Sequence, residues 1–398
     1  MNETSQQLRE TIDTFIQTAQ FDALLDTCRM ALRDARERGD RPSEILALIG
    51  LAQVHEYIGK FKEARVLIDG ALDFARQAGD AELETMALIV SGTIFVRAAY
   101  QPYEAEQDFR VALRIADDYG ELRLVAEALN GLSRAYLQMG THGRAQRYAR
   151  QGFEVARGIG DRYQMGKALY FVGEAASLNE PEKALQAFED AMEIAQQNNF
   201  RLLEVALVGS IGALLSAEER YADDGQLMLE KGLAMAKDFR SVPHEFAALR
   251  RLGITYQRQQ AYDRAAQYFG LALERAQEWR AQSYEGAAFY ALGVLAQIRE
   301  HYDDAIANFE QTLLITKQTK NPFQEAQTER ALGDCYLAQK NFDEALDHFM
   351  ASRTLYDALD STTMTNMLFQ KIVGVYIQRL VDQVLRLIGL REPSDRVQ

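Results

Sequence analysis

The sequence predicts an all-α protein, built as a solenoid of stacked antiparallel helix pairs. Three observations lead to this fold class: the composition, a repeat of about 40 residues, and small and aromatic residues at fixed places in that repeat. Ala, Leu, Glu, Gln and Arg are abundant and only six prolines occur among 398 residues, which favours helices. Hydrophobic residues make up 47% of the chain, enough for a long buried core.

The repeat is visible in two series of residues. Asp40, Asp80 and Asp161 each follow a glycine, and the second interval in this series is slightly more than twice the first. The second series comprises Leu252-Gly253, Leu292-Gly293 and Leu332-Gly333, then Tyr262, Tyr302 and Phe342, then Ala265, Ala305 and Ala345, then Phe269, Phe309 and Phe349. Its members recur at one constant interval, the same as that from Asp40 to Asp80, so the repeat marks a single structural unit.

The pattern within a unit predicts a helical hairpin. Leu252, Gly253 and Tyr256 share one face of a first helix. The glycine allows a second helix to approach closely, with Ala265 as the matching small residue and Phe269 filling space beside it. A single hairpin cannot bury its apolar face alone, so neighbouring hairpins must stack.

Some units depart from the pattern. Gly92 stands one residue early and Gly173 one residue late relative to the alanine of the second helix. Asp224 replaces that alanine in a third unit, which predicts looser or shifted packing there. The first unit has no glycine in its first helix and places Leu24 and Cys28 at core positions, as expected of a terminal capping repeat.

These positions follow the tetratricopeptide-repeat (TPR) pattern, and the chain resembles that family over about nine units. The family's usual unit has about 34 residues. The longer unit is similar to those of kinesin light chains, Pins-type polarity adaptors and bacterial peptide-sensing regulators of the Rap type. The resemblance implies a right-handed superhelical solenoid over residues 2–360. A C-terminal helix over residues 361–390 and a polar tail at 391–398 are expected to follow.

The segment 363–390 carries a wide apolar stripe and allows three interpretations. The first is a helix that caps the last repeat. The second is an interface for a homodimer or a partner. The third is membrane-surface binding, because Lys371, Arg379 and Arg386 are basic, although the acidic chain disfavours it.

Charge and cysteine content narrow the partners. The net charge of −14 argues against nucleic acid and against anionic membranes. The N-terminus shows no secretory signal, and no apolar stretch is long enough to span a membrane. Cys28 and Cys335 form no C-x-x-C motif, which fits a reducing, cytoplasmic compartment. The regular units and single-domain layout suggest a bacterial protein.

The sequence offers little for catalysis. No two of the five histidines lie four residues apart, and no nucleotide-binding glycine loop or nucleophile elbow occurs. Cys335 falls on the packing face and is expected to be a buried, inert thiol. We therefore expect no metal, no cofactor and no enzymatic activity.

The resemblance places the first helix of each hairpin on a concave groove. Transferring that geometry selects eight partner-binding residues: Arg97, Asn130, Arg134, Lys167, Tyr170, Arg250, Tyr290 and Arg330. Acidic residues lie among them, at Glu56, Glu127, Glu174 and Asp334. Arginine and asparagine suit carboxylates and the backbone of an extended peptide, so the expected ligand is a partly acidic protein segment. The alternative is that these are ordinary solvated positions with local ion pairs.

Two functions remain open from the sequence. The first is a non-catalytic scaffold or adaptor that binds a peptide or partner segment in the groove. The second is a regulatory sensor, in which a peptide or small ligand changes the pitch of the solenoid and so its hold on an effector protein. Rap-type regulators carry a helical bundle before their repeats, whereas these repeats begin near Met1, which lowers the second expectation.

Overall fold

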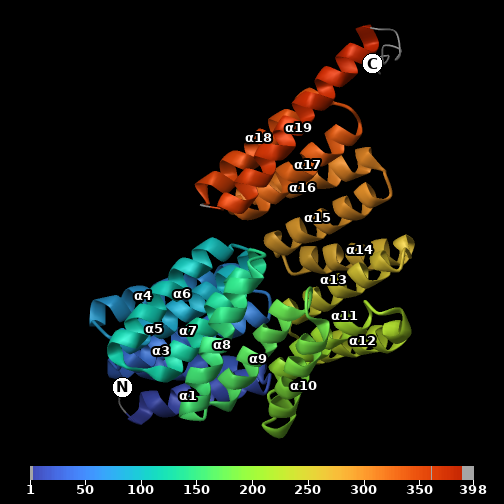
Figure 1. The fold of residues 1–398 in the computed structure, drawn as a ribbon. Coiled ribbons are helices and arrows are strands. Elements are labelled where there is room, and N and C mark those ends of the chain that lie inside the picture. The colour runs from blue at the N-terminus through green and yellow to red at the C-terminus, as the bar shows by residue number, and fades with distance from the viewer. Residues whose placement is uncertain (1–2, 360, 388–398) are drawn as a thin grey trace. The chain divides into compact units, whose positions relative to one another are not determined.

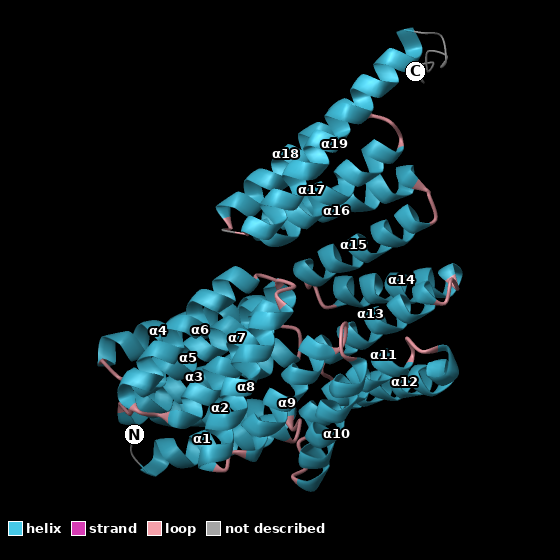
Figure 2. Ribbon diagram, in the orientation of Figure 1, coloured by secondary structure: helices cyan, strands magenta, loops and turns pink. Residues whose placement is uncertain are grey.

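The computed structural model describes residues 3–359 and 361–387. These residues form helices joined by short turns, and no strand occurs among them (Figures 1 and 2). The chain divides into two compact units, residues 1–284 (unit 1) and 285–398 (unit 2). No helix in the described part of the chain is long and apolar enough to cross a membrane. The predicted all-α repeat fold is confirmed.

Unit 1 contains helices of similar length that pair in chain order. They are α1 Glu3–Gln17, α2 Phe21–Arg38, α3 Arg41–Tyr57, α4 Phe61–Ala78, α5 Ala81–Ile94, α6 Pro102–Tyr119, α7 Leu122–Gln138, α8 His142–Ile159, α9 Arg162–Ala176, α10 Pro181–Gln197, α11 Arg201–Leu215, α12 Ala222–Asp238, α13 Val242–Arg258 and α14 Tyr262–Glu278. A π-helix, η1 Phe95–Ala99, continues α5, and a short 3₁₀ helix, η2 Glu219–Tyr221, precedes α12.

Unit 2 continues the same alternation. Its helices are α16 Tyr302–Thr319, α17 Pro322–Ala338, α18 Phe342–Ala358 and α19 Thr362–Leu387, and the boundary between the units falls within α15 Gln282–Ile298. The predicted C-terminal helix is thus described as far as Leu387. The rest of its predicted range and the predicted tail at 391–398 lie outside the described residues.

The recurring Gly-Asp dipeptides end one helix and begin the next. Gly39 adopts a left-handed conformation (φ 69°) after α2, and its N–H donates to the carbonyl of Arg36. The Asp40 carboxylate then accepts a hydrogen bond from the N–H of Ser43 in the first turn of α3. The same arrangement recurs at Gly79-Asp80 and Gly160-Asp161, so the sequence repeat is a repeat of helix caps.

Left-handed turn residues recur at a constant interval in the second half of the array. They are Arg240, Gln260, Arg280, Glu300, Lys320 and Lys340, each with a positive φ. One helix and its turn therefore occupy half of the sequence repeat, and a hairpin occupies the whole of it.

Several hairpins are fixed by a phenylalanine ring lying on a glycine of the facing helix. A Cβ atom on Gly253 would stand 2.4 Å from the ring of Phe269, and Gly293 and Gly333 face Phe309 and Phe349 in the same way. The sequence interpretation assigned the matching role to the alanine. The structure shows that the glycine makes room for the aromatic ring, while Ala265 is simply buried nearby.

The irregular units keep a close contact at the glycine of the first helix. Gly92 still meets Phe109, and Gly173 still meets Phe188, although each glycine is displaced by one residue from the regular pattern. Beside Asp224, it is Gly225 that approaches Gly212, where an added Cβ would lie 2.7 Å from the Gly212 carbonyl oxygen. The predicted shift in packing is therefore a shift by one residue.

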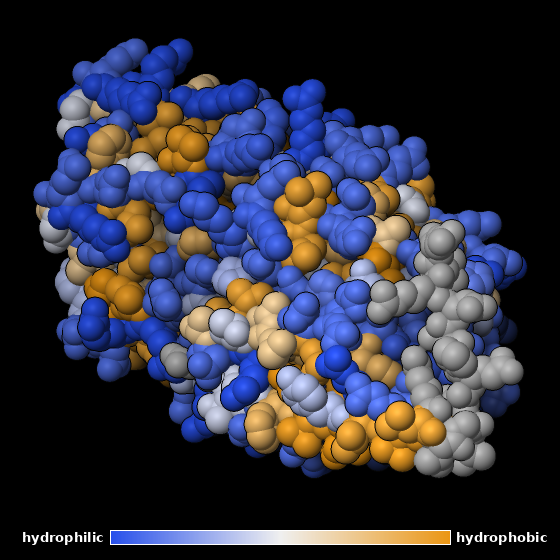
Figure 3. All heavy atoms as spheres, turned by 90° about the horizontal axis from the view of Figure 1, so that it is seen from above, coloured by the Kyte–Doolittle hydropathy of each residue, from blue (hydrophilic) through white to orange (hydrophobic). Residues whose placement is uncertain are grey.

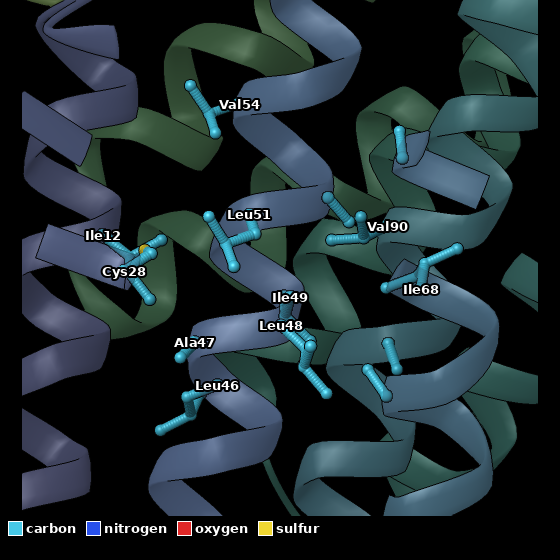
Figure 4. Packing of buried hydrophobic residues seen from close by; sticks show 14 of the residues in the cluster. Ile12, Cys28, Leu46, Ala47, Leu48, Ile49, Leu51, Val54, Ile68 and Val90 are labelled. Carbon is cyan, nitrogen blue, oxygen red and sulfur yellow. The ribbon is translucent and has the colours of Figure 1, made fainter. Parts of the chain in front are cut away.

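The core of the first hairpins is centred on α3, in which residues 43–52 are all buried and mostly apolar. Ile12 and Cys28 meet one side of α3, while Ile68 and Val90 pack on the other (Figure 4). Leu24 and Cys28 are fully buried, as predicted for the first unit. A mostly apolar helix segment must be covered on all sides, so α3 requires neighbours from several hairpins.

The helices of unit 1 curve until distant parts of the chain meet. Helix α1 contacts α11, and α3 contacts α13. The rings of Tyr57 and His244 stack with centroids 6.2 Å apart, and Leu202 joins the hydrophobic core around α3. Because these contacts join helices ten positions apart in the chain, they enclose the concave side of unit 1.

The glycine–phenylalanine contact can be tested within one hairpin. Gly253→Ala places a methyl group against Phe269 and is expected to lower stability by about 1–3 kcal/mol. Gly270, in the facing helix, has open space around its Cα, so Gly270→Ala is expected to raise stability by about 0.5–1 kcal/mol. Urea unfolding combined with hydrogen exchange in α13 and α14 measures both. Equal effects of the two substitutions would contradict the assignment.

Candidate functional site

The concave side of unit 1 encloses a pocket of about 110 Å³. Its walls come from α1, α3, α5 with η1, α7, α9, α11 and α13, the first helices of successive hairpins. Among the described residues that line it, Phe109 of α6 is the one that belongs to a second helix. The pocket is therefore formed where the superhelix of unit 1 closes on itself.

The structure brings together five of the eight predicted binding residues in this pocket. Arg97, Asn130, Arg134, Lys167 and Tyr170 all line it. Two of the acidic residues predicted to accompany them, Glu56 and Glu127, line it as well.

The other three predicted residues lie elsewhere. Arg250 donates a hydrogen bond from Nη1 to the Tyr100 hydroxyl, 3.2 Å away, outside the pocket lining. Tyr290 and Arg330 belong to unit 2, where Arg330 pairs with Asp334 at 3.2 Å. Glu174 likewise stands apart from the lining, in an ion pair with Arg251.

Arg97 and Glu56 form the buried ion pair of the pocket. Nη1 of Arg97 lies 3.0 Å from Oε2 of Glu56, and the guanidinium stacks 4.5 Å from the ring of Tyr57. Burial raises the pKa of Glu56, and the attraction of Arg97 and Arg134 opposes that rise. Arg97 is carried by η1, a π-helix of the kind often found at functional sites.

Arg134 differs from Arg97 because it has no acidic partner. Among the described residues no carboxylate lies within ion-pair distance of its guanidinium, which rests 5.2 Å from the centre of the Phe171 ring. Burial lowers the pKa of Arg134, and repulsion from Arg97 lowers it further. The side chain thus brings into the pocket a positive charge that is attracted to Glu56 but forms no direct ion pair.

Lys167 and His244 complete the basic side of the pocket. Lys167 Nζ lies 3.8 Å from Glu127 Oε1, and burial lowers its pKa. Burial holds the pKa of His244 well below its ordinary value, with further lowering by Arg97, Arg134 and Arg251. His244 is therefore neutral near pH 7, with its Nδ1 atom 2.7 Å from the Ser241 hydroxyl.

Three acceptor atoms of the lining also have no partner. They are Gln53 Oε1, Glu56 Oε1 and Asn130 Oδ1, which are buried without a hydrogen bond from any described residue. The amide of Asn130 donates to the backbone and side chain of Gln164, at 3.1 and 3.0 Å. A pocket with an unpaired cation and unpaired acceptors is suited to a ligand that carries both an anion and N–H groups.

The sequence analysis missed several residues of this pocket. Arg123, Tyr163, Gln164 and His244 lie in the first turns of α7, α9 and α13 and line the cavity. The transferred geometry selected only positions near the key glycine of each helix. Selecting also the positions two to three turns before that glycine would have identified these residues.

Unit 2 has a smaller charged cluster of its own. Asp334 on α17 forms ion pairs with Arg330 and with Lys371 of α19. Tyr290 interacts with Arg330 by a hydrogen bond, which lowers its pKa, but burial is the larger effect and the net pKa is raised. Each charged group of this cluster has an ion-pair partner, so it resembles the alternative of local ion pairs.

The two cysteines have the burial expected of unreactive thiols. Cys28 and Cys335 are fully buried, and burial raises the pKa of each to about 12. In the described part of the chain no group of three histidine, cysteine, aspartate or glutamate side chains is arranged to hold a metal ion. The expectation that the protein is not an enzyme stays a prediction.

Stacked helix pairs curving around a shared pocket define a helical-repeat scaffold of the class that binds other proteins. Residues 284–358 match the family model of the tetratricopeptide repeat. These residues therefore carry the tetratricopeptide repeat that the sequence pattern predicted. Residues 11–96 and 122–208 also match the family model described as anaphase-promoting complex subunit 5. No curated protein matches the sequence.

Solved structures with a similar fold have low sequence identity. One is a Signal Transduction ATPase with Numerous Domains protein with a tetratricopeptide repeat sensor from Pyrococcus horikoshii, with TM-score 0.50 and 13% identity. The similarity covers 86% of this chain and 57% of that one, so the chain spans just over half of that protein. A Rap protein complexed with competence and sporulation factor has TM-score 0.49 and 12% identity, covering 96% and 99%. Aspartyl phosphate phosphatase F from Bacillus subtilis has TM-score 0.48 and 15% identity, covering 89% and 94%.

Replacing each of the two pocket arginines by methionine is expected to change stability in opposite directions. Arg134→Met removes a cation without an ionic partner and is expected to raise stability by roughly 1 kcal/mol. Arg97→Met leaves Glu56 buried and unpaired and is expected to cost about 3–5 kcal/mol. Thermal unfolding of both variants at pH 7 checks this. A loss of stability in Arg134→Met as large as in Arg97→Met would show that Arg134 has a structural partner.

Proposed function

We propose that the protein is a non-catalytic interaction scaffold whose unit 1 pocket binds an acidic peptide segment of a partner protein. The proposal depends on one observation above all, the unpaired guanidinium of Arg134 inside the pocket. Arg134 is partly exposed and forms no ion pair, and a ligand carboxylate would supply that partner.

The unpaired acceptors favour a peptide over a simple anion. Gln53 and Glu56 each have a buried oxygen without a hydrogen-bond donor among the described residues, whereas the unpaired oxygen of Asn130 faces Gly152 of α8. A peptide offers backbone N–H groups to such oxygens, whereas a phosphate or sulfate at neutral pH offers few or none. A ligand with both a carboxylate and N–H groups would pair with the cation and with the acceptor oxygens of the lining.

The charge of the pocket supports an acidic ligand. Its lining contains Arg97, Arg123, Arg134 and Lys167 against Asp13, Glu56 and Glu127, which is an excess of one positive charge. The whole chain carries −14. The volume of about 110 Å³ suits the side chain and adjoining backbone of one or two residues, so the remainder of a longer segment would lie beyond the pocket.

The experiment is binding of the purified protein to an array of acidic peptides and their Glu→Gln and Asp→Asn counterparts. The wild-type protein is expected to retain acidic peptides and to release the neutral ones. Arg134→Met is expected to bind them about 10–100-fold more weakly, because one charge-assisted hydrogen-bonding partner is lost.

The control is Arg258→Met, which removes an exposed arginine from the end of α13, outside the pocket lining. It is expected to bind as the wild type does. If Arg134→Met also binds as the wild type does, the pocket is not the site. Capture from the native lysate with the same variants then identifies the partner.

A second candidate function is a ligand-gated regulator. It is favoured by the contacts that close the pocket, since α1 and α3 meet α11 and α13 around it. Arg123 of α7 pairs with Asp13 of α1, and both line the pocket. A ligand that touches these helices would therefore shift the closure of unit 1 and change the surface offered to an effector.

Gating can be measured across the closure of unit 1. Asp22 and Arg240 are exposed and form an ion pair at 3.4 Å across it, so spin labels on cysteines at these positions report its opening. The native cysteines are buried, so labelling is specific. For a regulator, an acidic peptide selected on the array is expected to shift the distance distribution. An unchanged distribution at saturation would leave the simple scaffold.

A further inference from the structure

One face of α19 is apolar and exposed. It consists of Phe369, Val373, Tyr376, Ile377, Leu380, Val381, Val384 and Leu387, each between 40% and 85% exposed, and we refer to it as the α19 outer face. Apolar residues are visible among the polar ones in Figure 3, which views the molecule from above. No other helix in the described part of the chain carries as many exposed large hydrophobic residues.

The opposite face of α19 performs the capping role. Leu368, Ile372 and Val375 are buried where α19 packs on α18. In earlier hairpins a first helix contacts both the preceding helix and its own second helix, as α17 contacts α16 and α18. Helix α19 has the preceding contact, and its outer face stands where a further helix would pack.

Two basic side chains of α19, Lys371 and Arg379, form ion pairs away from the outer face. Lys371 pairs with Asp334 of α17, and Arg379 pairs with Asp343 of α18 at 2.7 Å. An amphipathic helix that binds anionic membranes needs free basic residues beside its apolar face. These two are neutralised within the chain, which argues against a membrane and against a strongly acidic partner.

The outer face has the spacing of a coiled-coil seam. Phe369, Val373, Tyr376, Leu380 and Leu387 fall at intervals of four, three, four and seven residues, and Gln383 occupies the position between the last two. Alternating intervals of four and three residues describe a helix that pairs with another helix of the same repeat. The occupant of this face is therefore a helix with a matching neutral, apolar seam.

We propose that the α19 outer face binds the same face of a second copy of the chain, forming a homodimer. An identical face meets the requirement of a matching seam, and its lack of ionised groups lets two copies approach without like-charge repulsion in the contact. The eight side chains expose on the order of 800 Å² per chain, close to the ~800 Å² per partner of a standard stable interface.

Sedimentation velocity at micromolar concentrations tests the proposal on the full chain. The wild type is expected to sediment with twice the 45.0 kDa chain mass. Leu380→Glu is expected to weaken association by about 100-fold or more, because it places a charge in the seam of both copies. Val66→Glu, at a 72% exposed position of α4, adds the same charge elsewhere and is expected to remain dimeric.

Salt dependence provides a second readout. Dimerisation through a neutral face of two acidic chains is expected to be unchanged or strengthened from low to high salt. A monomeric wild type overturns the proposal. So does a dimer that dissociates in high salt, or one in which Leu380→Glu associates as tightly as Val66→Glu. These outcomes are independent of peptide binding at Arg134, which lies in unit 1.

Discussion

The contact between a phenylalanine ring and a facing glycine sets the spacing of several helix pairs, and the regular stacking of these pairs depends on it. In α13 and α14, Phe269 lies where any Cβ atom on Gly253 would collide, so the two helices pack more closely than larger residues would allow. Repeating this contact along similar hairpins accumulates curvature. In unit 1 the curvature brings α1 and α3 against α11 and α13, and those contacts enclose the pocket.

The pocket combines a buried ion pair with a charged side chain that forms no ion pair. The pair of Arg97 and Glu56 is matched and buried, whereas Arg134 beside it has no carboxylate among the described residues. Both arginines come from first helices and face the same cavity. Arg134 forms no ion pair that would stabilise the fold, so its positive charge remains open to the cavity.

The local parts of the structure were predictable because they repeat. Gly39 and Asp40 indicate a helix end and start, and the period of Gly253, Gly293 and Gly333 identified the hairpins. The resemblance to the repeat family placed Arg134 and Lys167 on the concave side, and both line the pocket. It could not reveal that Glu56 is committed to Arg97, because pairing depends on side-chain directions. Nor could it reveal the stacking of Tyr57 on His244, which depends on curvature summed over many helices.

Helix α19 illustrates a related limit of sequence patterns. Its wide apolar stripe allowed capping, pairing and membrane binding alike, since hydrophobicity alone does not say what covers a face. The structure divides the stripe into a buried side against α18 and an exposed side, and it commits Lys371 and Arg379 to ion pairs. Because Lys371 and Arg379 are paired within the chain, their charge does not draw α19 to an acidic surface. The exposed side of α19 then interacts through apolar contacts. Its seam spacing suits packing against a second helix.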